Sequence, residues 1–352
     1  MRVVSPLLKH VVYPGLSRTG YLRQRHRFSP AVLTYHGVLP EGYRVIDPHL
    51  DGNLLSEEHL RQQIRFLKTD YEVISPEDFR ASCEAKCKLP PRAVLLTCDD
   101  GLRNHFTAML PVLQEAAVRC LFFVIGASRE NAATMLWHEQ LYLLFLAGAE
   151  TIRLDLTEAG VRSEAHGRSA KRALWRSLVV QLSAFDGQRR RKLLDEIQMQ
   201  LGVPESWDAK YREDPLLAAR FLTLNRDELR QLANAGMTIG AHTDSHPNLS
   251  QMPEDLVVRE LRQNRQELEL TLGQQVWALA YPFGDPGSVS AREIALAEQC
   301  GFTCAFVNYE YKFEGDCPRF AFPRVHVTAE MTLVELEARL SGFHSSLRQL
   351  LA

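Results

Sequence analysis

Two adjacent carboxylates, Asp99 and Asp100, follow an apolar run that begins at Val94 and stops at Gly101. An apolar run of this length that ends at a turn residue is typical of a buried strand, so both carboxylates are expected at its C-terminal end. In parallel α/β sheets and barrels, that end carries the chemistry. Because neighbouring strand residues point to opposite sides and like charges repel, we expect a metal ion on one carboxylate, which leaves the other to act as a base.

A pair of histidines follows a second predicted strand, Met237–Ala241, in the segment His242-Thr-Asp-Ser-His246-Pro247. Two histidines four residues apart could share a helix face, but the proline and the preceding strand favour a loop at a strand end. Two imidazoles and one carboxylate, with positions left open for water and substrate, suit catalytic zinc. A third apolar strand, Ala278–Ala280, leads into Tyr281-Pro282-Phe283-Gly284, which could form a groove wall with exposed backbone N–H groups.

These segments resemble the motifs of the polysaccharide deacetylases, the NodB-homology carbohydrate esterases. Thr97-Cys98-Asp99-Asp100-Gly101 resembles their Thr-Phe-Asp-Asp-Gly motif, and His242 to His246 resembles their His-(Ser/Thr)-x-x-His motif. The segment from Tyr281 to Gly284 resembles their third motif, and the order along the chain agrees. The resemblance covers residues 31–128 and 222–328. It implies an α/β fold, a deformed (β/α)7-type barrel.

The resemblance also implies the roles of the residues. A divalent ion, expected to be Zn2+ with Co2+ or Ni2+ as alternatives, would bind Asp100, His242 and His246, and Asp99 would be the catalytic base. Tyr281, Pro282, Phe283, Gly284 and Arg324 are the expected substrate-binding residues.

A histidine must protonate the leaving amine, since an amine anion is a very poor leaving group. The predicted strand at 31–38 contains Tyr35-His36-Gly37, which resembles the circularly permuted branch of the family, where the acid histidine comes from the first strand. His36 is therefore the expected acid, and His326 of the last predicted strand is the alternative. His36 could also be a capping or core histidine.

The chain departs from the family pattern at two positions. Many relatives carry an arginine ahead of the third-motif proline, which orients the base carboxylate, where this chain has Ala280. Arg324, from the last strand, could take its place. Cys98 replaces the usual phenylalanine, and we expect a packing change there and not a thiol nucleophile. His105 is expected on a helix surface.

Length and composition fit one barrel with an insertion. The 352 residues are 45% hydrophobic and 24% charged, which is ample for a large core. Strands and helices alternate through 31–352, which predicts a mostly parallel sheet. The alternation is interrupted at 129–222, where helices are expected at 136–147, 170–185 and 188–201 with a strand-like piece at 151–156. This insertion could form a lid, a substrate-recognition surface or a partner-docking site, and its Trp137-His138-Glu139 segment could face the site or simply pack.

The net charge and the cysteine content limit the expected partners and the expected compartment. A net charge of −2 gives no support to a nucleic-acid role. Seven cysteines without a close Cys-x-x-Cys pair suggest free thiols in a reducing compartment. Residues 1–30 form a basic extension, expected to be solvated, although it could rest on an anionic membrane surface. This extension lacks a signal-peptide core, and we expect a cytoplasmic protein, located at the inner face of the membrane if that contact forms.

The expected function is the removal of N-acetyl groups from amino sugars, within a polysaccharide or on a lipid-linked glycan precursor; a missing export signal favours the precursor. A second hypothesis is an amidohydrolase that acts on a formyl group or a non-sugar amide. A third is a catalytically silent glycan-binding homologue, made conceivable by the missing arginine.

Overall fold

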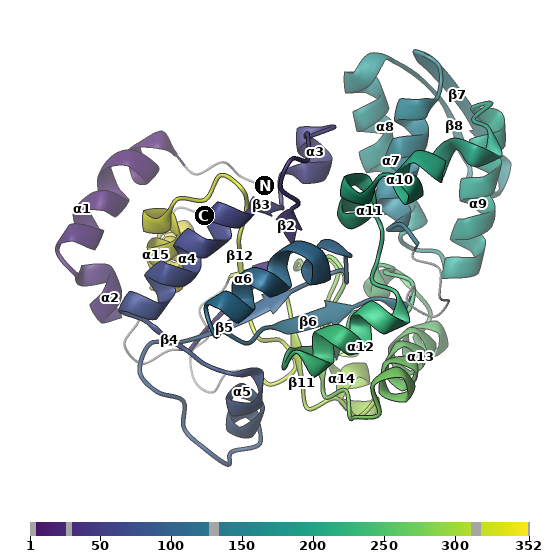
Figure 1. Cartoon of the computed structure of the whole chain (residues 1–352). Helices are drawn as coiled ribbons and strands as arrows, with labels where there is room; N and C mark the ends of the chain where they lie inside the picture. Colours follow the sequence, from purple (N-terminus) through teal and green to yellow (C-terminus); the bar gives the residue numbers. More distant parts are fainter. Residues whose placement is uncertain (1–4, 26–29, 127–133, 311–317, 351–352) are drawn as a thin grey trace.

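In the computed structural model, a parallel sheet curls into a half-barrel of seven strands with helices around it (Figure 1). The structure describes residues 5–25, 30–126, 134–310 and 318–350. The strand order is β11-β10-β9-β6-β5-β1-β12, and β4 pairs with β5 beside this path. The predicted deformed (β/α)7-type barrel is therefore confirmed. The strands are β1 (Ala31–Tyr35), β4 (Glu72–Val73), β5 (Ala93–Cys98), β6 (Leu121–Val124), β9 (Thr238–Ala241), β10 (Ala278–Ala280), β11 (Cys304–Phe306) and β12 (Val325–His326).

Both faces of the sheet are apolar because helices cover the outside and side chains fill the inside. Successive strand residues alternate between the two. On β5, Leu95 belongs to the core inside the barrel, whereas Leu96 packs toward the helices. The two end strands approach each other through a parallel bridge between Phe306 and Phe322, which lies just before β12. The half-barrel therefore closes through a short irregular segment.

Helices follow most of the strands and begin at capping residues that the sequence marks. Ser56 accepts from the backbone N–H of His59 at the start of α4, and Asn225 and Glu228 form a reciprocal capping box at the start of α12. The helices of the barrel are α4 (Glu57–Asp70), α5 (Pro76–Cys83), α6 (Leu110–Glu115), α12 (Arg226–Asn234), α13 (Glu254–Leu272), α14 (Ala291–Gln299) and α15 (Leu333–Leu340).

Residues 134–222, between β6 and α12, form a separate helical layer at one end of the barrel (Figure 1). It has a hydrophobic core of its own, which the barrel residues Leu50 and Phe283 join. The three helices expected there are present, and the strand-like piece is β7. An antiparallel partner strand, β8, and two further helices were not expected. Its elements are α7 (Trp137–Ala147), β7 (Thr151–Leu156), β8 (Val161–His166), α8 (Gly167–Leu182), α9 (Gly187–Gln200), α10 (Ala209–Glu213) and α11 (Pro215–Phe221).

The described part of the N-terminal segment packs against α15 (Figure 1). The side chains of Tyr13 and Leu22 are fully buried there with Ala338, and the Tyr13 hydroxyl lies 2.6 Å from Nδ1 of His344. The expectation of a solvated extension is therefore wrong, because Tyr13 and Leu22, together with part of the other apolar residues of the segment, cover a helix. A further helix, α16, follows α15.

Within the described ranges, no helix is both long and apolar enough to cross a membrane. Several short elements complete the fold. The short elements are η1 (Leu8–Val12), α1 (Tyr13–Arg18), α2 (Tyr21–Arg25), β2 (Val38–Leu39), α3 (Pro48–Asp51), β3 (Leu55–Ser56), η2 (His105–Met109), η4 (Thr157–Ala159), η5 (Glu205–Asp208) and η6 (Leu249–Gln251), with α16 (Phe343–Leu350) at the end.

Candidate metal centre

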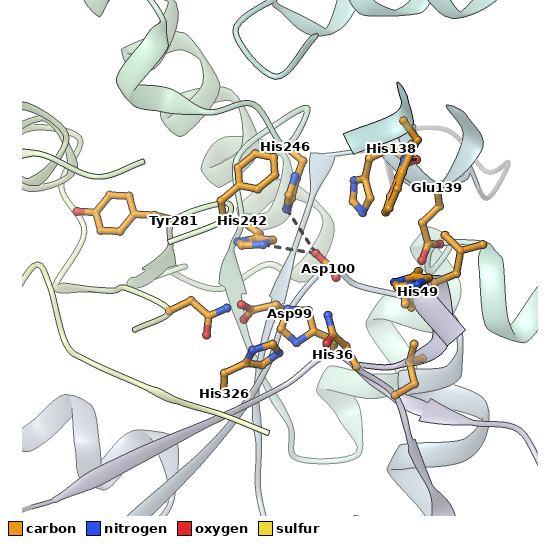
Figure 2. Close-up of a pocket in the computed structure, with 17 residues that line it drawn as sticks. His36, His49, Asp99, Asp100, His138, Glu139, His242, His246, Tyr281 and His326 are labelled. Carbon is orange, nitrogen blue, oxygen red and sulfur yellow. Dashed lines mark hydrogen bonds and ion pairs between the residues drawn. The ribbon is translucent and has the colours of Figure 1, made fainter. Parts of the chain in front are cut away.

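The C-terminal ends of the barrel strands meet at a pocket of about 270 Å³ (Figure 2). His36 follows β1, the two aspartates follow β5, and the histidine pair follows β9. The insertion adds side chains from α7 and α8. The pocket is lined by His36, His49, Leu50, Asn53, Leu54, Asp99, Asp100, Leu102, His138, Glu139, Trp175, His242, His246, Tyr281, Phe283, Asn308 and His326.

Asp100, His242 and His246 converge in this pocket. Oδ1 of Asp100 lies 3.6 Å from Nε2 of His242 and 3.5 Å from Nε2 of His246. Ligand atoms of a tetrahedral zinc ion with bonds of about 2.0–2.1 Å lie about 3.3 Å apart. Within the described part of the chain, this is the one group of three His, Cys, Asp or Glu side chains close enough to share an ion. Donor types and spacing therefore fit a divalent metal ion.

The structure orients the first histidine toward its partner. Nδ1 of His242 lies 2.7 Å from the carbonyl oxygen of Ala280, which leaves Nε2 facing Asp100. Burial alone would raise the pKa of Asp100, but the hydrogen bond with His242 and the nearby imidazoles hold it well below its usual range. Burial also lowers the pKa of His246, which favours the neutral imidazole that binds metals.

Asp99 is held by an arginine from the last strand segment. Nη1 and Nη2 of Arg324 each donate to one oxygen of Asp99, both over 2.7 Å. Burial would raise the pKa of Asp99, but the guanidinium and the His242 imidazole lower it. Arg324 therefore supplies the charge missing at Ala280. Its side chain is fully buried against Asp99, which is the place expected for an arginine that orients the base, and it is not among the residues that line the pocket.

His36 and His326 lie side by side, with ring centroids 4.8 Å apart. Burial, followed by the charge of His36, lowers the pKa of His326 to about 3. The chain after His36 turns at Gly37, which has φ +132°, and a Cβ there would lie 2.2 Å from Oδ1 of Asn104. That oxygen accepts from the N–H of Val38. The turn that aims His36 therefore requires glycine.

His105 is fully buried, so the prediction of a helix-surface residue is wrong. Its Nε2 lies 3.2 Å from Sγ of Cys98 and 3.3 Å from the carbonyl oxygen of His36. Burial lowers the pKa of His105 to about 4. Burial also raises the pKa of the Cys98 thiol, which agrees with the packing role expected for this residue. The six cysteines in the described ranges are free thiols, and Cys317 lies outside those ranges.

The third-motif segment contributes to the pocket in part. The Tyr281 ring points away from Asp100 (Figure 2), and its hydroxyl donates to the carbonyl oxygen of Phe320 over 3.0 Å. Phe283, at φ +61°, contacts His246, with ring centroids 5.1 Å apart. Pro282 and Gly284 shape the turn and are not among the pocket residues. Of this segment, Phe283 is the side chain placed to meet a ligand.

Several pocket residues carried no clear signal in the sequence. His49 comes from the short helix α3, Asn53 and Asn308 come from loops, and Trp175 comes from the insertion. His138, left open in the sequence between facing the site and packing, lies beside His246 with ring centroids 5.4 Å apart (Figure 2). Neither a motif nor a periodic pattern marks these residues, because their role depends on how the insertion docks.

Comparisons with known proteins agree with this geometry. The family model described as polysaccharide deacetylase matches residues 86–200 and 205–305, more than half of the chain. No curated protein matches the chain. Three solved structures share the fold at low sequence identity, and each is similar over most of both chains.

The Streptococcus pyogenes deacetylase PplD in complex with acetate is 16% identical, with 88% of this chain and 97% of that one covered and a TM-score of 0.54. IcaB from Ammonifex degensii is 16% identical, with 89% and 97% covered and a TM-score of 0.53. The de-N-acetylase from Aggregatibacter actinomycetemcomitans is 15% identical, with 88% and 98% covered and a TM-score of 0.52.

Proposed function

Because the chain belongs to the polysaccharide deacetylase family, we propose that it is a metal-dependent hydrolase that removes N-acetyl groups from an amino-sugar polysaccharide or its lipid-linked precursor. One observation carries the proposal. Three donor atoms of Asp100, His242 and His246 converge beside Asp99, a second carboxylate that Arg324 holds in place. That combination offers a metal site and a positioned base in one pocket.

When bound at these three residues, a divalent ion, expected to be Zn2+, polarises the amide carbonyl and lowers the pKa of water toward about 7. Asp99 accepts a proton from the attacking water, since each of its oxygens keeps a free lone pair beside the bond from Arg324. His36 donates a proton to the amine nitrogen as the C–N bond breaks. The products are acetate and a free amine.

The pairing of Arg324 with Asp99 bears on the catalytically silent alternative. That hypothesis was motivated by the absence of an arginine at Ala280, and a guanidinium reaches the same carboxylate from another strand. The released product distinguishes the alternative acyl groups, because a formyl substrate would give formate. A cytoplasmic location, contact with a membrane and a lipid-linked substrate stay predictions.

The test uses the full chain loaded with Zn2+ and incubated with N-acetylglucosamine oligosaccharides. We expect acetate and free amines in equal amounts from the wild type. Asp99→Asn should keep its metal and lose activity by roughly 10²- to 10⁴-fold, as for other general bases. Arg162→Met, a change at an exposed side chain of the insertion, is the control. Full metal loading without release of acetate from any acetylated glycan would contradict the proposal, and release of formate from formylated analogues would redirect it.

A further inference from the structure

The insertion contacts the loop that carries His246, the second histidine of the pair. Nε1 of Trp137, on α7, donates to the carbonyl oxygen of His246 over 3.0 Å. The guanidinium of Arg190, on α9, donates to both the carbonyl oxygen and the hydroxyl of Ser245, the latter over 2.7 Å. Two helices of the insertion thus hold the main chain at and beside a candidate ligand.

Arg190 is placed unusually for a cation. Its side chain is 2% exposed, and its guanidinium lies over the Trp137 ring, 4.8 Å from the centroid. It also donates to the carbonyl oxygen of Phe185. Burial lowers the pKa of Arg190 to about 10, so the group stays charged at neutral pH. A buried cation is costly unless its donors are satisfied, and here Ser245 satisfies part of them.

The opposite side of the same loop is fixed by the barrel. Glu260, on α13, accepts from the N–H of Ser245 over 2.8 Å and from its hydroxyl over 2.7 Å. Ser245 is therefore held between the insertion and a barrel helix. The approach is close, because a Cβ at Gly187 would lie 2.7 Å from Cβ of Ser245.

The backbone and the ring of His246 both need this support. Thr243 and His246 have φ +65° and +56°, a left-handed conformation that non-glycine residues adopt only when their surroundings hold them. Within the described ranges, Nδ1 of His246 has no hydrogen-bond partner. His242 differs, because Ala280 orients its ring. The orientation of the His246 imidazole therefore depends on its main chain and on the packing around it.

We propose that the insertion braces the metal site, with Trp137 and Arg190 as positioning residues that fix the main chain of Ser245 and His246. The inference rests on the proposed metal-dependent function. It assigns the insertion a role inside the site itself, in addition to the wall that it forms around the pocket.

The test measures the dissociation constant of Zn2+ on the metal-free full chain by competition with a chromophoric chelator. Trp137→Phe removes the N–H donor and keeps an aromatic ring under Arg190. Arg190→Met removes the guanidinium. We expect each variant to bind zinc 10- to 100-fold more weakly, the range typical of groups that support metal ligands. Arg190→Lys, which keeps a charge and donors, should recover part of the loss.

Matched controls separate positioning from general damage. Trp207→Phe changes another tryptophan of the insertion, and Arg191→Met changes the exposed neighbour on α9. Both should bind zinc as the wild type does. Thermal unfolding of each metal-free variant measures the purely structural effect, and Trp137→Phe decides the question if Arg190→Met fails to fold.

Three outcomes are informative. Weaker zinc binding by Trp137→Phe, with its metal-free unfolding unchanged, supports the brace. Wild-type zinc affinity in a folded Trp137→Phe, or a loss no larger than in the controls, overturns it and leaves the proposed function intact. Absence of zinc binding by the wild type would overturn the metal-dependent function and the brace together.

Discussion

The imidazoles of His36 and His326 face the same pocket but differ in their surroundings. His326 is half-buried, as His36 is, but burial and the neighbouring His36 lower the pKa of His326 to about 3, so it is neutral at pH 7. His36 is half-buried and follows the first strand, directly beside the aspartates. A proton donor must carry its proton at working pH. The neutral state of His326 therefore favours His36 as the general acid.

This assignment predicts unequal effects of two matched substitutions. His36→Asn should lower kcat by about 10²- to 10⁴-fold, because it removes the proton donor. His326→Asn should have a much smaller effect. The measurement is acetate release at saturating substrate, with metal content determined on both variants. A larger loss in His326→Asn at equal metal content would reverse the two roles.

His105 couples folding stability to pH. Its pKa is about 4 in the folded chain because it is buried, against an ordinary value of 6.5. The folded state favours the neutral ring, so His105 contributes stability that is present above pH 6.5 and is lost as the pH falls toward 4. Between pH 7 and pH 5 this loss amounts to about 2 kcal/mol.

Urea unfolding at pH 7 and at pH 5 tests this. His105→Asn removes the titrating group. Between pH 7 and pH 5, the free energy of unfolding of the wild type should therefore fall by about 2 kcal/mol more than that of the variant. His59→Asn, a histidine on the surface helix α4, is the control. An equal pH dependence in His105→Asn and wild type would show that the buried ring is not responsible.

At the scale of elements, Arg220 joins three segments. From α11, its guanidinium donates to Asp51 of α3 over 2.6 Å and to Glu139 of α7 over 2.7 and 3.1 Å. All three side chains are buried. Asp51 and Glu139 belong to the elements that form the pocket wall. The arginine therefore links the barrel loop, the insertion and the site.

Arg220→Met should lower the free energy of unfolding by about 3–5 kcal/mol, because it removes the ion-pair partner of two buried carboxylates. Denaturant unfolding measures the effect. The double variant Arg220→Met/Glu139→Gln should be more stable than Arg220→Met, since one of the charges is removed. Arg162→Met, whose side chain is 87% exposed, should change stability little. If the exposed and buried substitutions cost the same, the network is not the reason for stability.

At the scale of the whole molecule, a bound ion would join distant parts of the chain. Asp100 follows β5, and the histidine pair follows β9 on the other side of the insertion. An ion that binds only the folded state adds about 2.7 kcal/mol at a concentration 100 times its Kd. For a chain of this size, that corresponds to a rise in Tm of roughly 4 °C.

Elemental analysis and thermal unfolding check this prediction together. The wild type should hold about one divalent ion per chain, as one tetrahedral site requires, and should melt higher with Zn2+ than without it. Asp100→Ala and His242→Ala should lose both the ion and the rise in Tm. A rise in Tm that persists in these variants would place the ion elsewhere.

Local patterns in the sequence were sufficient for much of the fold. Strand runs and the turns after β5 and β9 depend on neighbours in the chain, and they are as predicted. Three motifs in order resemble those of the polysaccharide deacetylases, and the family model agrees with that resemblance. The strand runs and turns follow from local spacing.

Other features depend on contacts between residues far apart in the chain. Arg324 and Asp99 are separated by 225 positions. They meet because β5 and β12 both pair with β1, which brings the segments that carry them to the same part of the sheet. The burial of His105 and of Tyr13 depends on which helix or strand packs above them. The sequence by itself determined the donor residues and the strands that carry them. Only the tertiary structure decided which guanidinium orients Asp99 and which insertion residues support His246, because packing between distant segments leaves no periodic trace in the sequence.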